Sequence, residues 1–287
     1  MKLAFSTLGC PDWELQRIAQ AALDLGYEGI ELRAIGGELD LLKRPELQPQ
    51  RVDATRRSLV AQGLSVCCVD SSCTFDSTDP NERHQQVEVA VKHCELAAAL
   101  GSELIRVFPD KVQAGAKREE TRDNIASCLG EVARRAPPGV RVGLETHGDF
   151  ARGHAAAEIV KLAGHRNVAL IWDVANALAA GDSIEESARE VSPYLAHVHL
   201  RDARPVEGRE HWQPVLAGRG KVSFGQAIDA LHNLNYKGFI SFEWEKYWHP
   251  EIEEPEVALT DFAEAMNLVL ERTRGSTPAS AVRYVES

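Results

Sequence analysis

Short apolar runs alternate with amphipathic stretches along the whole chain, and this rhythm constrains the fold more than any other feature. The interval is roughly 25 to 40 residues, which is typical of repeated β-α units that build a parallel sheet. We count eight such units in the 287 residues. The expected strands span residues 3–6, 29–32, 65–70, 104–108, 141–145, 169–172, 196–200 and 239–244.

The amphipathic segments between these strands predict a helix after each one. Asp12 is an expected N-cap, and Asp79 is another, with Pro80 as the first helical residue. Several helices are expected to end at a glycine, which tolerates the left-handed conformation of a helix stop. The expected helices span residues 12–25, 49–62, 79–100, 117–135, 153–163, 183–191, 223–234 and 255–274.

Two folds share this rhythm, the closed (β/α)₈ TIM barrel and the open doubly wound sheet. The length suits a barrel, which typically needs about 250 residues. The segment Leu8-Gly9-Cys10 after the first strand lacks the glycine-rich phosphate fingerprint of many doubly wound folds. We therefore predict a single-domain α/β protein, a TIM barrel over residues 1–274, with a C-terminal tail at 275–287 that can pack on a neighbour in a homo-oligomer.

Composition narrows the classes of partner. The net charge of −11 and the pI near 5.4 argue against nucleic acid and anionic lipid surfaces as partners. The six cysteines lack paired C-x-x-C spacing, so we expect packing residues in a reduced chain. The start of the chain does not read as a signal peptide and no long apolar run follows, which predicts a cytoplasmic protein with no membrane partner.

Four consecutive expected strands end in residues that commonly bind metals. These residues are Glu145, Asp173, His199 and Glu243. Taken alone, each of these residues is more often a helix cap or a solvated loop residue than a metal ligand. Together at one barrel mouth they are better explained by a metal, because buried charges need pairing. Three carboxylates and one imidazole suit Mn²⁺ first, with Mg²⁺, Co²⁺ or Zn²⁺ as alternatives.

The chain resembles the sugar phosphate isomerase/epimerase superfamily, whose members have a xylose isomerase-like barrel. The resemblance runs from Leu-Ala-Phe-Ser at residues 3–6 and Gly-Tyr-Glu-Gly-Ile-Glu-Leu at 26–32 to the strand at 238–245, and it is strongest from Glu145 onward. It implies that Glu145, Asp173, His199 and Glu243 form the metal set and that the two glutamates transfer protons. It thus implies a carbohydrate substrate without fixing which sugar.

The implied chemistry is physically sound. Removing a proton beside a carbonyl gives an enediolate, whose charge a divalent metal stabilises as a Lewis acid. Glu145 and Glu243 would remove and return the proton, giving epimerisation at one carbon or isomerisation across two. Loss of a β-hydroxyl from the same intermediate would make the protein a dehydratase of a keto-polyol such as an inosose.

Two departures from the family pattern bear on the substrate. Many relatives carry histidine three residues after the metal aspartate, where this chain has Asn176. The segment Glu145-Thr146-His147 also differs from the proline-bearing segment of ketose 3-epimerases. Both changes argue against a simple assignment as a ketose 3-epimerase.

Further polar residues at expected strand ends are candidate substrate ligands. Arg201 alternates back to the face of His199, and a surface ion pair with Asp202 is the alternative. Glu31 and Arg106 are equally well explained as substrate contacts or as an ion pair inside the barrel. The remaining candidates are His147 beside Glu145, and Lys246, Trp248 and His249 at the rim; His197 is expected to be a buried core histidine.

Two other functions fit the sequence less well. Apurinic endonucleases share this barrel, but their three-zinc chemistry needs more histidines, and the acidic chain lacks a basic track for DNA. A non-catalytic sugar-binding barrel would not need a pair of proton-transferring glutamates. The long connection at 203–221, with Arg209, His211, Trp212 and Arg219, is expected to cover the mouth as a lid.

Overall fold

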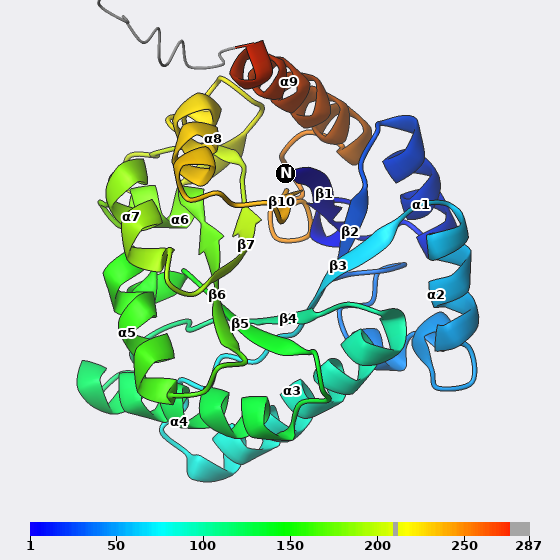
Figure 1. Ribbon diagram of the computed structural model, residues 1–287. Coiled ribbons are helices and arrows are strands. Elements are labelled where there is room, and N and C mark those ends of the chain that lie inside the picture. The colour runs from blue at the N-terminus through cyan, green and yellow to red at the C-terminus, as the bar shows by residue number, and fades with distance from the viewer. Residues whose placement is uncertain (209–211, 276–287) are drawn as a thin grey trace, which may run out of the picture.

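The computed structural model describes residues 1–208 and 212–275, and its eight parallel strands close into a barrel ringed by helices (Figure 1). Around the barrel the strands follow the order β1-β10-β7-β6-β5-β4-β3-β2. The prediction of a TIM barrel is confirmed, and each expected strand is present. The barrel strands are β1 (Lys2–Ser6), β2 (Gly29–Leu32), β3 (Ser65–Asp70), β4 (Leu104–Val107), β5 (Arg141–Glu145), β6 (Val168–Asp173), β7 (Leu195–His199) and β10 (Phe239–Phe242).

The helices also follow the expected pattern, with one addition, α6, directly after β6. Asp79 caps α3 as predicted, since its carboxylate accepts the backbone N–H of Asn81 at 2.8 Å. The cap predicted at Asp12 is wrong: α1 starts later, with Glu14 at the N-cap position and no side-chain cap bond. The helices are α1 (Leu15–Asp24), α2 (Val52–Ala61), α3 (Pro80–Leu100), α4 (Arg118–Arg135), α5 (Gly153–Ala163), α6 (Val174–Ala179), α7 (Ile184–Val191), α8 (Phe224–Asn233) and α9 (Pro255–Gly275).

No helix in the described ranges is long and apolar enough to cross a membrane. The last described helix ends at Gly275, the first residue of the predicted tail, and residues 276–287 of that tail lie outside the described residues.

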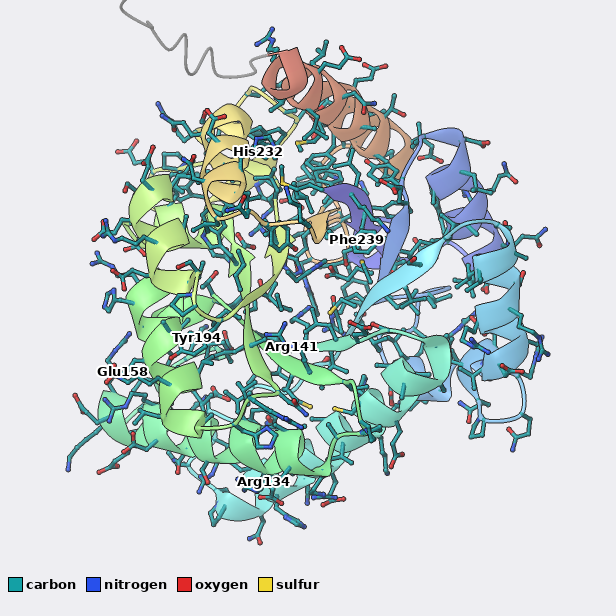
Figure 2. The ribbon with its side chains drawn as sticks, in the orientation of Figure 1. Arg134, Arg141, Glu158, Tyr194, His232 and Phe239 are labelled. Atoms are coloured by element: carbon teal, nitrogen blue, oxygen red, sulfur yellow. The ribbon has the colours of Figure 1, made fainter. Side chains whose placement is uncertain are left out.

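Apolar side chains form two separate regions. The larger region fills the space between the strands and the surrounding helices, whose outer faces carry charged residues such as Arg134 and Glu158 (Figure 2). A small cluster of Cys68, Leu104 and Ile171 is the second. These residues lie on β3, β4 and β6, and Ile171 is two residues before Asp173 on the same strand, so it shares that residue's face. This cluster therefore plugs the barrel interior beneath the polar strand ends.

The cysteines are buried packing residues, in line with the expectation from their spacing. All six are free thiols, and five of them are buried. Burial raises the pKa of Cys73 and of Cys128 to about 11, so these thiols stay protonated near neutral pH.

The connection after β7 is more ordered than a simple loop. Its two ends pair as the short antiparallel strands β8 (Asp202–Arg204) and β9 (Gln213–Val215). The Asp202 carboxylate accepts backbone N–H bonds from Ala203, Gly220 and Val222 at 2.7–3.0 Å and so holds the base of the connection. The alternative of a surface ion pair between Asp202 and Arg201 is therefore wrong. Arg209 and His211 of the expected lid lie outside the described residues.

The turn after β5 requires a glycine, and this requirement can be tested. Gly148 has a φ of +54°, and a Cβ added there would lie 1.8 Å from the Asp110 carbonyl oxygen. We expect Gly148→Ala to destabilise the fold by roughly 3 kcal/mol, since strain adds to a backbone clash. Urea denaturation monitored by circular dichroism measures this loss.

Gly164 provides the matched control because its φ is +63° but its added Cβ would come no closer than 3.7 Å to Leu162. Gly164→Ala should cost about 1 kcal/mol from the left-handed conformation alone. Equal losses in the two variants would contradict the clash at Gly148.

Candidate metal centre

The strand register brings the four expected ligands to one side of the barrel mouth. Asp173 at the end of β6 pairs directly with His199 at the end of β7. His199 pairs with Ser241 of β10, so Glu243 projects inward two residues further along. On the other side, Glu145 pairs with Ile171, two residues before Asp173. The ladder alone therefore stacks the four side chains around one point.

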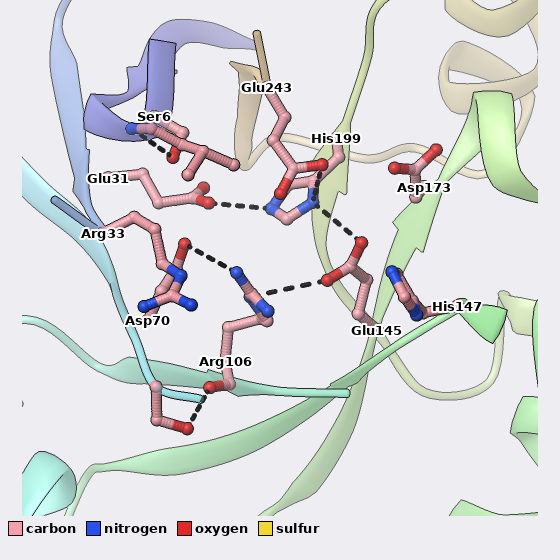
Figure 3. A network of polar contacts seen from close by, with 12 residues as sticks. Ser6, Glu31, Arg33, Asp70, Arg106, Glu145, His147, Asp173, His199 and Glu243 are labelled. Carbon is pink, nitrogen blue, oxygen red and sulfur yellow. Dashed lines mark hydrogen bonds and ion pairs between the residues drawn. The ribbon is translucent and has the colours of Figure 1, made fainter. Parts of the chain in front are cut away.

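These side chains offer ligand atoms that all lie within 4.8 Å of one another (Figure 3). His199 Nδ1 is 3.6 Å from Glu145 Oε1 and 3.3 Å from Glu243 Oε2. All four residues are buried, with Asp173 and His199 fully enclosed. The structure thus gathers the residues that the sequence proposed as a metal set.

The mouth holds more negative than positive charge. Its buried carboxylates outnumber its buried guanidinium groups, which belong to Arg33, Arg106 and Arg201, by five to three. Burial, with smaller contributions from nearby Glu243 and Glu145, raises the pKa of Asp173 to about 7 against the opposing charge of Arg201. A divalent cation would offset part of the negative charge of this group. The carboxylates are Glu31, Asp70, Glu145, Asp173 and Glu243.

Glu31 fixes the orientation of the histidine ring. Its Oε1 lies 2.9 Å from His199 Nε2, and its Oε2 lies 2.6 Å from His197 Nε2. With Nε2 turned toward Glu31, Nδ1 faces Glu145 and Glu243, and it could bind a metal once the imidazole is neutral. His197 is buried, as expected for a core histidine, and its hydrogen bond to Glu31 helps to hold that carboxylate in place.

Arg201 crosses the metal side of the mouth. Its Nη1 contacts the carboxylate of Asp173 and lies 3.2 Å from Glu243 Oε2, while its Nη2 donates to Asn176 Oδ1 at 3.1 Å. The expectation that Arg201 faces inward beside His199 is therefore met. The amide of Asn176 also approaches Glu145 Oε1 at 3.5 Å, so it links Arg201 to a candidate ligand.

Arg106 connects the metal side of the mouth to the strands before it. Its guanidinium lies 3.4 Å from both Asp70 Oδ2 and Glu145 Oε2. Of the two interpretations of Arg106 from the sequence, a substrate contact or an ion pair inside the barrel, the structure shows the ion pair. Asp70 was not among the predicted site residues, although it is the last residue of an expected strand, as Glu145 is. Arg33, which follows the end of β2, was not among them either.

The remaining candidates lie at the edge of the mouth. The His147 ring packs edge-on against Phe108, and its Nδ1 is 3.9 Å from Asp110 Oδ1. Lys246 Nζ donates to the carbonyls of Pro250 and Ile252 and contacts Glu254. All three ammonium protons are thus used within its own loop, so the structure does not bring Lys246 into the site. Trp248 is half exposed and His249 faces Glu245 and Glu251.

The donor set fits a divalent metal. Within the described ranges, both ring nitrogens of His199 are buried without a hydrogen bond of good geometry, and three carboxylates lie around the ring on the Nδ1 side. An oxygen-rich set with one imidazole suits Mn²⁺, Mg²⁺, Co²⁺ or Zn²⁺. A second possible group, Glu31 with His197 and His199, has hydrogen-bond spacings and serves better to orient the first.

A family model described as the xylose isomerase-like TIM barrel matches residues 19–274. The chain belongs to this family. Among curated relatives, a putative L-ribulose-5-phosphate 3-epimerase of Escherichia coli is 28% identical over 218 residues, 70% of this chain and 74% of that protein. An inosose isomerase of Halalkalibacterium halodurans is 23% identical over 229 residues, 76% and 78% of the two chains. A probable endonuclease 4 of Campylobacter concisus is 24% identical over 203 residues, 63% and 71%.

The matches span 61% to 79% of the lengths of the curated relatives. Among solved structures, an L-ribulose 3-epimerase superposes with a TM-score of 0.78 at 16% identity, covering 98% of this chain and 99% of that one. The zinc-bound IolI protein gives 0.76 at 20% identity, with 95% and 99% covered. A probable 3-DHS dehydratase from Bacillus anthracis gives 0.73 at 18%, with 93% and 99% covered. At these identities the structures establish the fold alone.

The assignment of the metal ligands can be tested at Asp173. Its Oδ1 also caps α6 by accepting the Asn176 backbone N–H at 2.8 Å, and asparagine retains such a cap. Asp173→Asn should therefore keep the fold while lowering metal affinity by roughly 100-fold or more, beyond the usual effect of a supporting residue. Calorimetric titration of the metal-stripped protein with Mn²⁺ measures the affinity. Unchanged affinity there and in His199→Ala would show that the ligands are misassigned.

The supporting role of Glu31 gives a second test. Glu31→Gln weakens the anchor on His199 Nε2, so we expect metal affinity to fall roughly 10- to 100-fold with the four ligands intact. Glu245→Gln is the control, because Glu245 lies near Arg201 on the same rim. A loss in the control equal to that in Glu31→Gln would mean that the effect comes from overall charge.

Proposed function

We propose that this protein is a divalent-metal-dependent isomerase or epimerase that acts on a sugar or sugar derivative by proton transfer between glutamates. The observation that carries this proposal is the placement of Glu145 and Glu243 on either side of His199 Nδ1, at 3.6 and 3.3 Å, in a buried set of four metal-type donors. Relatives named as an epimerase and an inosose isomerase support the reaction class.

Different residues of the site are proposed to bind the metal, transfer the proton and contact the substrate. A divalent metal bound by the four donors would supply Lewis acidity that lowers the energy of an enediolate. Glu145 and Glu243 approach from β5 and β10, so one carboxylate can remove a proton and the other can return one. Arg201 and Arg106 hold these two glutamates, and with Glu31 and His147 they are the proposed contacts for substrate oxygens.

A dehydratase is the second candidate, since a probable dehydratase shares the fold and the same enediolate can lose a β-hydroxyl. An endonuclease remains weaker despite the curated relative of that name. In the described part of the chain, the possible metal groups include histidine only at positions 197 and 199. The acidic chain also opposes binding to a phosphate backbone.

The two-glutamate mechanism is tested by Glu145→Gln and Glu243→Gln. Glutamine keeps the size and one oxygen for the metal but cannot carry the proton. Turnover should therefore fall by about 10²-fold or more while metal is partly retained. The assay is a nuclear magnetic resonance survey of ketoses, inososes and related keto acids in D₂O with Mn²⁺, which reports proton exchange even where no product accumulates.

The two variants also separate the roles. Loss of the base should abolish exchange, whereas loss of its partner should leave exchange without net epimerisation. Near-normal turnover in both variants with metal bound would refute the mechanism and favour a dehydratase that uses other groups, or a binding protein.

A further inference from the structure

Arg33 is a buried cation with unused hydrogen-bonding groups. It directly follows β2 and shares the inward face of Glu31, and its backbone is held because the N–H groups of Arg33 and Ala34 donate to Thr7 Oγ1 at 2.8 and 3.0 Å. The residue is 3% exposed. Its Nη2 donates to Ser72 Oγ at 2.9 Å, but Nε and Nη1 have no partner among the described residues.

The neighbouring carboxylates are engaged elsewhere. Asp70 and Glu145 pair with Arg106, and Glu243 pairs with Arg201. Within the described chain, no ion pair of 4.0 Å or less forms at Arg33. Burial, followed by the adjacent charge of Arg106, lowers the pKa of Arg33 to about 10 against the opposing pull of nearby acids. A guanidinium in this state calls for an anion that the chain itself does not provide.

The position of Arg33 relates it to the candidate metal centre. The four metal donors come from β5, β6, β7 and β10, whereas Arg33, Asp70 and Arg106 come from β2, β3 and β4 on the other side of the same mouth (Figure 3). A substrate whose reacting carbons lie between Glu145 and Glu243 would extend its far end across Arg106 toward Arg33.

We propose that Arg33 binds an oxyanion, a carboxylate or a phosphate, at the non-reacting end of the substrate, so that the substrate is an acidic carbohydrate. This inference rests on the proposed function for the position of the reacting end. Charge-assisted hydrogen bonds from Nε and Nη1 would fix that end and use its binding energy to align the reacting carbons. A neutral sugar with the same skeleton would leave these donors unpaired.

The first experiment measures proton exchange in D₂O, with the metal-loaded protein, on matched neutral and acidic ketoses. The pairs are D-ribulose with D-ribulose 5-phosphate, and D-fructose with D-fructuronate, so that one pair tests phosphate and the other carboxylate. The wild type should prefer the acidic member of one pair by roughly 10- to 100-fold in kcat/KM. Arg33→Met should remove this preference, because kcat/KM should fall roughly 10- to 100-fold more for the acidic member than for the neutral one.

Arg57→Met is the matched control, because Arg57 is exposed and its guanidinium pairs with Asp53 on α2. It should keep the full preference. Exchange of both pairs without an acidic preference in the wild type, or a preference that survives in Arg33→Met, would overturn the role of Arg33 while leaving the proposed function intact.

A second readout does not depend on turnover. Thermal unfolding of the wild type should shift upward with inorganic phosphate or glycolate, and Arg33→Met should lose most of this shift. Since methionine removes an unpaired buried charge, the variant alone should melt no lower than the wild type. A markedly lower melting temperature with the anion shift retained would assign Arg33 a purely structural role. Absence of exchange on every ketose with the anion shift at Arg33 intact would instead refute the isomerase proposal alone.

Discussion

The repulsion among five carboxylates buried in one mouth is the constraint on which the rest of this structure depends. Burial disfavours the charged form of each, and each is a neighbour of another. Burial raises the pKa of Asp70 well above its ordinary value, with repulsion from Glu31 adding to the shift, which shows how costly the arrangement is. Such a cluster persists in a stable fold where cations offset it, so its presence indicates a site and not a feature of packing.

The barrel meets this constraint by placing cations between the acids. Arg106 separates Asp70 from Glu145, and Arg201 separates Asp173 from Glu243. For His199 burial opposes the charge, but Glu243 and Glu31 outweigh it and raise the pKa of the imidazole. Beneath this layer lies the apolar cluster of the barrel interior, and charge interactions are stronger in such low-dielectric surroundings than in water.

The features predicted correctly from the sequence are those that a local residue pattern determines, such as the strands and the residues at their ends. Each strand end is visible in the sequence as the point where an apolar run stops. Once a barrel was inferred, the four metal-type residues at these ends were expected to meet at its mouth. Contacts that depend on tertiary distance did not follow: the partners of Lys246 come from a loop that folds back on it, and α6 is a six-residue helix too short for periodicity. The ion pair between Arg201 and Asp202 fails for a simpler reason, because neighbours in extended chain point to opposite faces.

Asn176 is a departure from the family pattern that lies beside the candidate metal centre. The resemblance noted from the sequence implies a histidine at this position in many members of the superfamily. Here the neutral amide accepts a hydrogen bond from Arg201 at 3.1 Å and donates one to the Thr146 carbonyl at 3.2 Å. Its hydrogen bonds therefore hold the arginine and the turn after β5. An arginine fixed in this position places positive charge beside Asp173 and Glu243, which disfavours a second cation there. The departure from the family pattern at Asn176 therefore goes together with an arginine held against two of the candidate metal ligands.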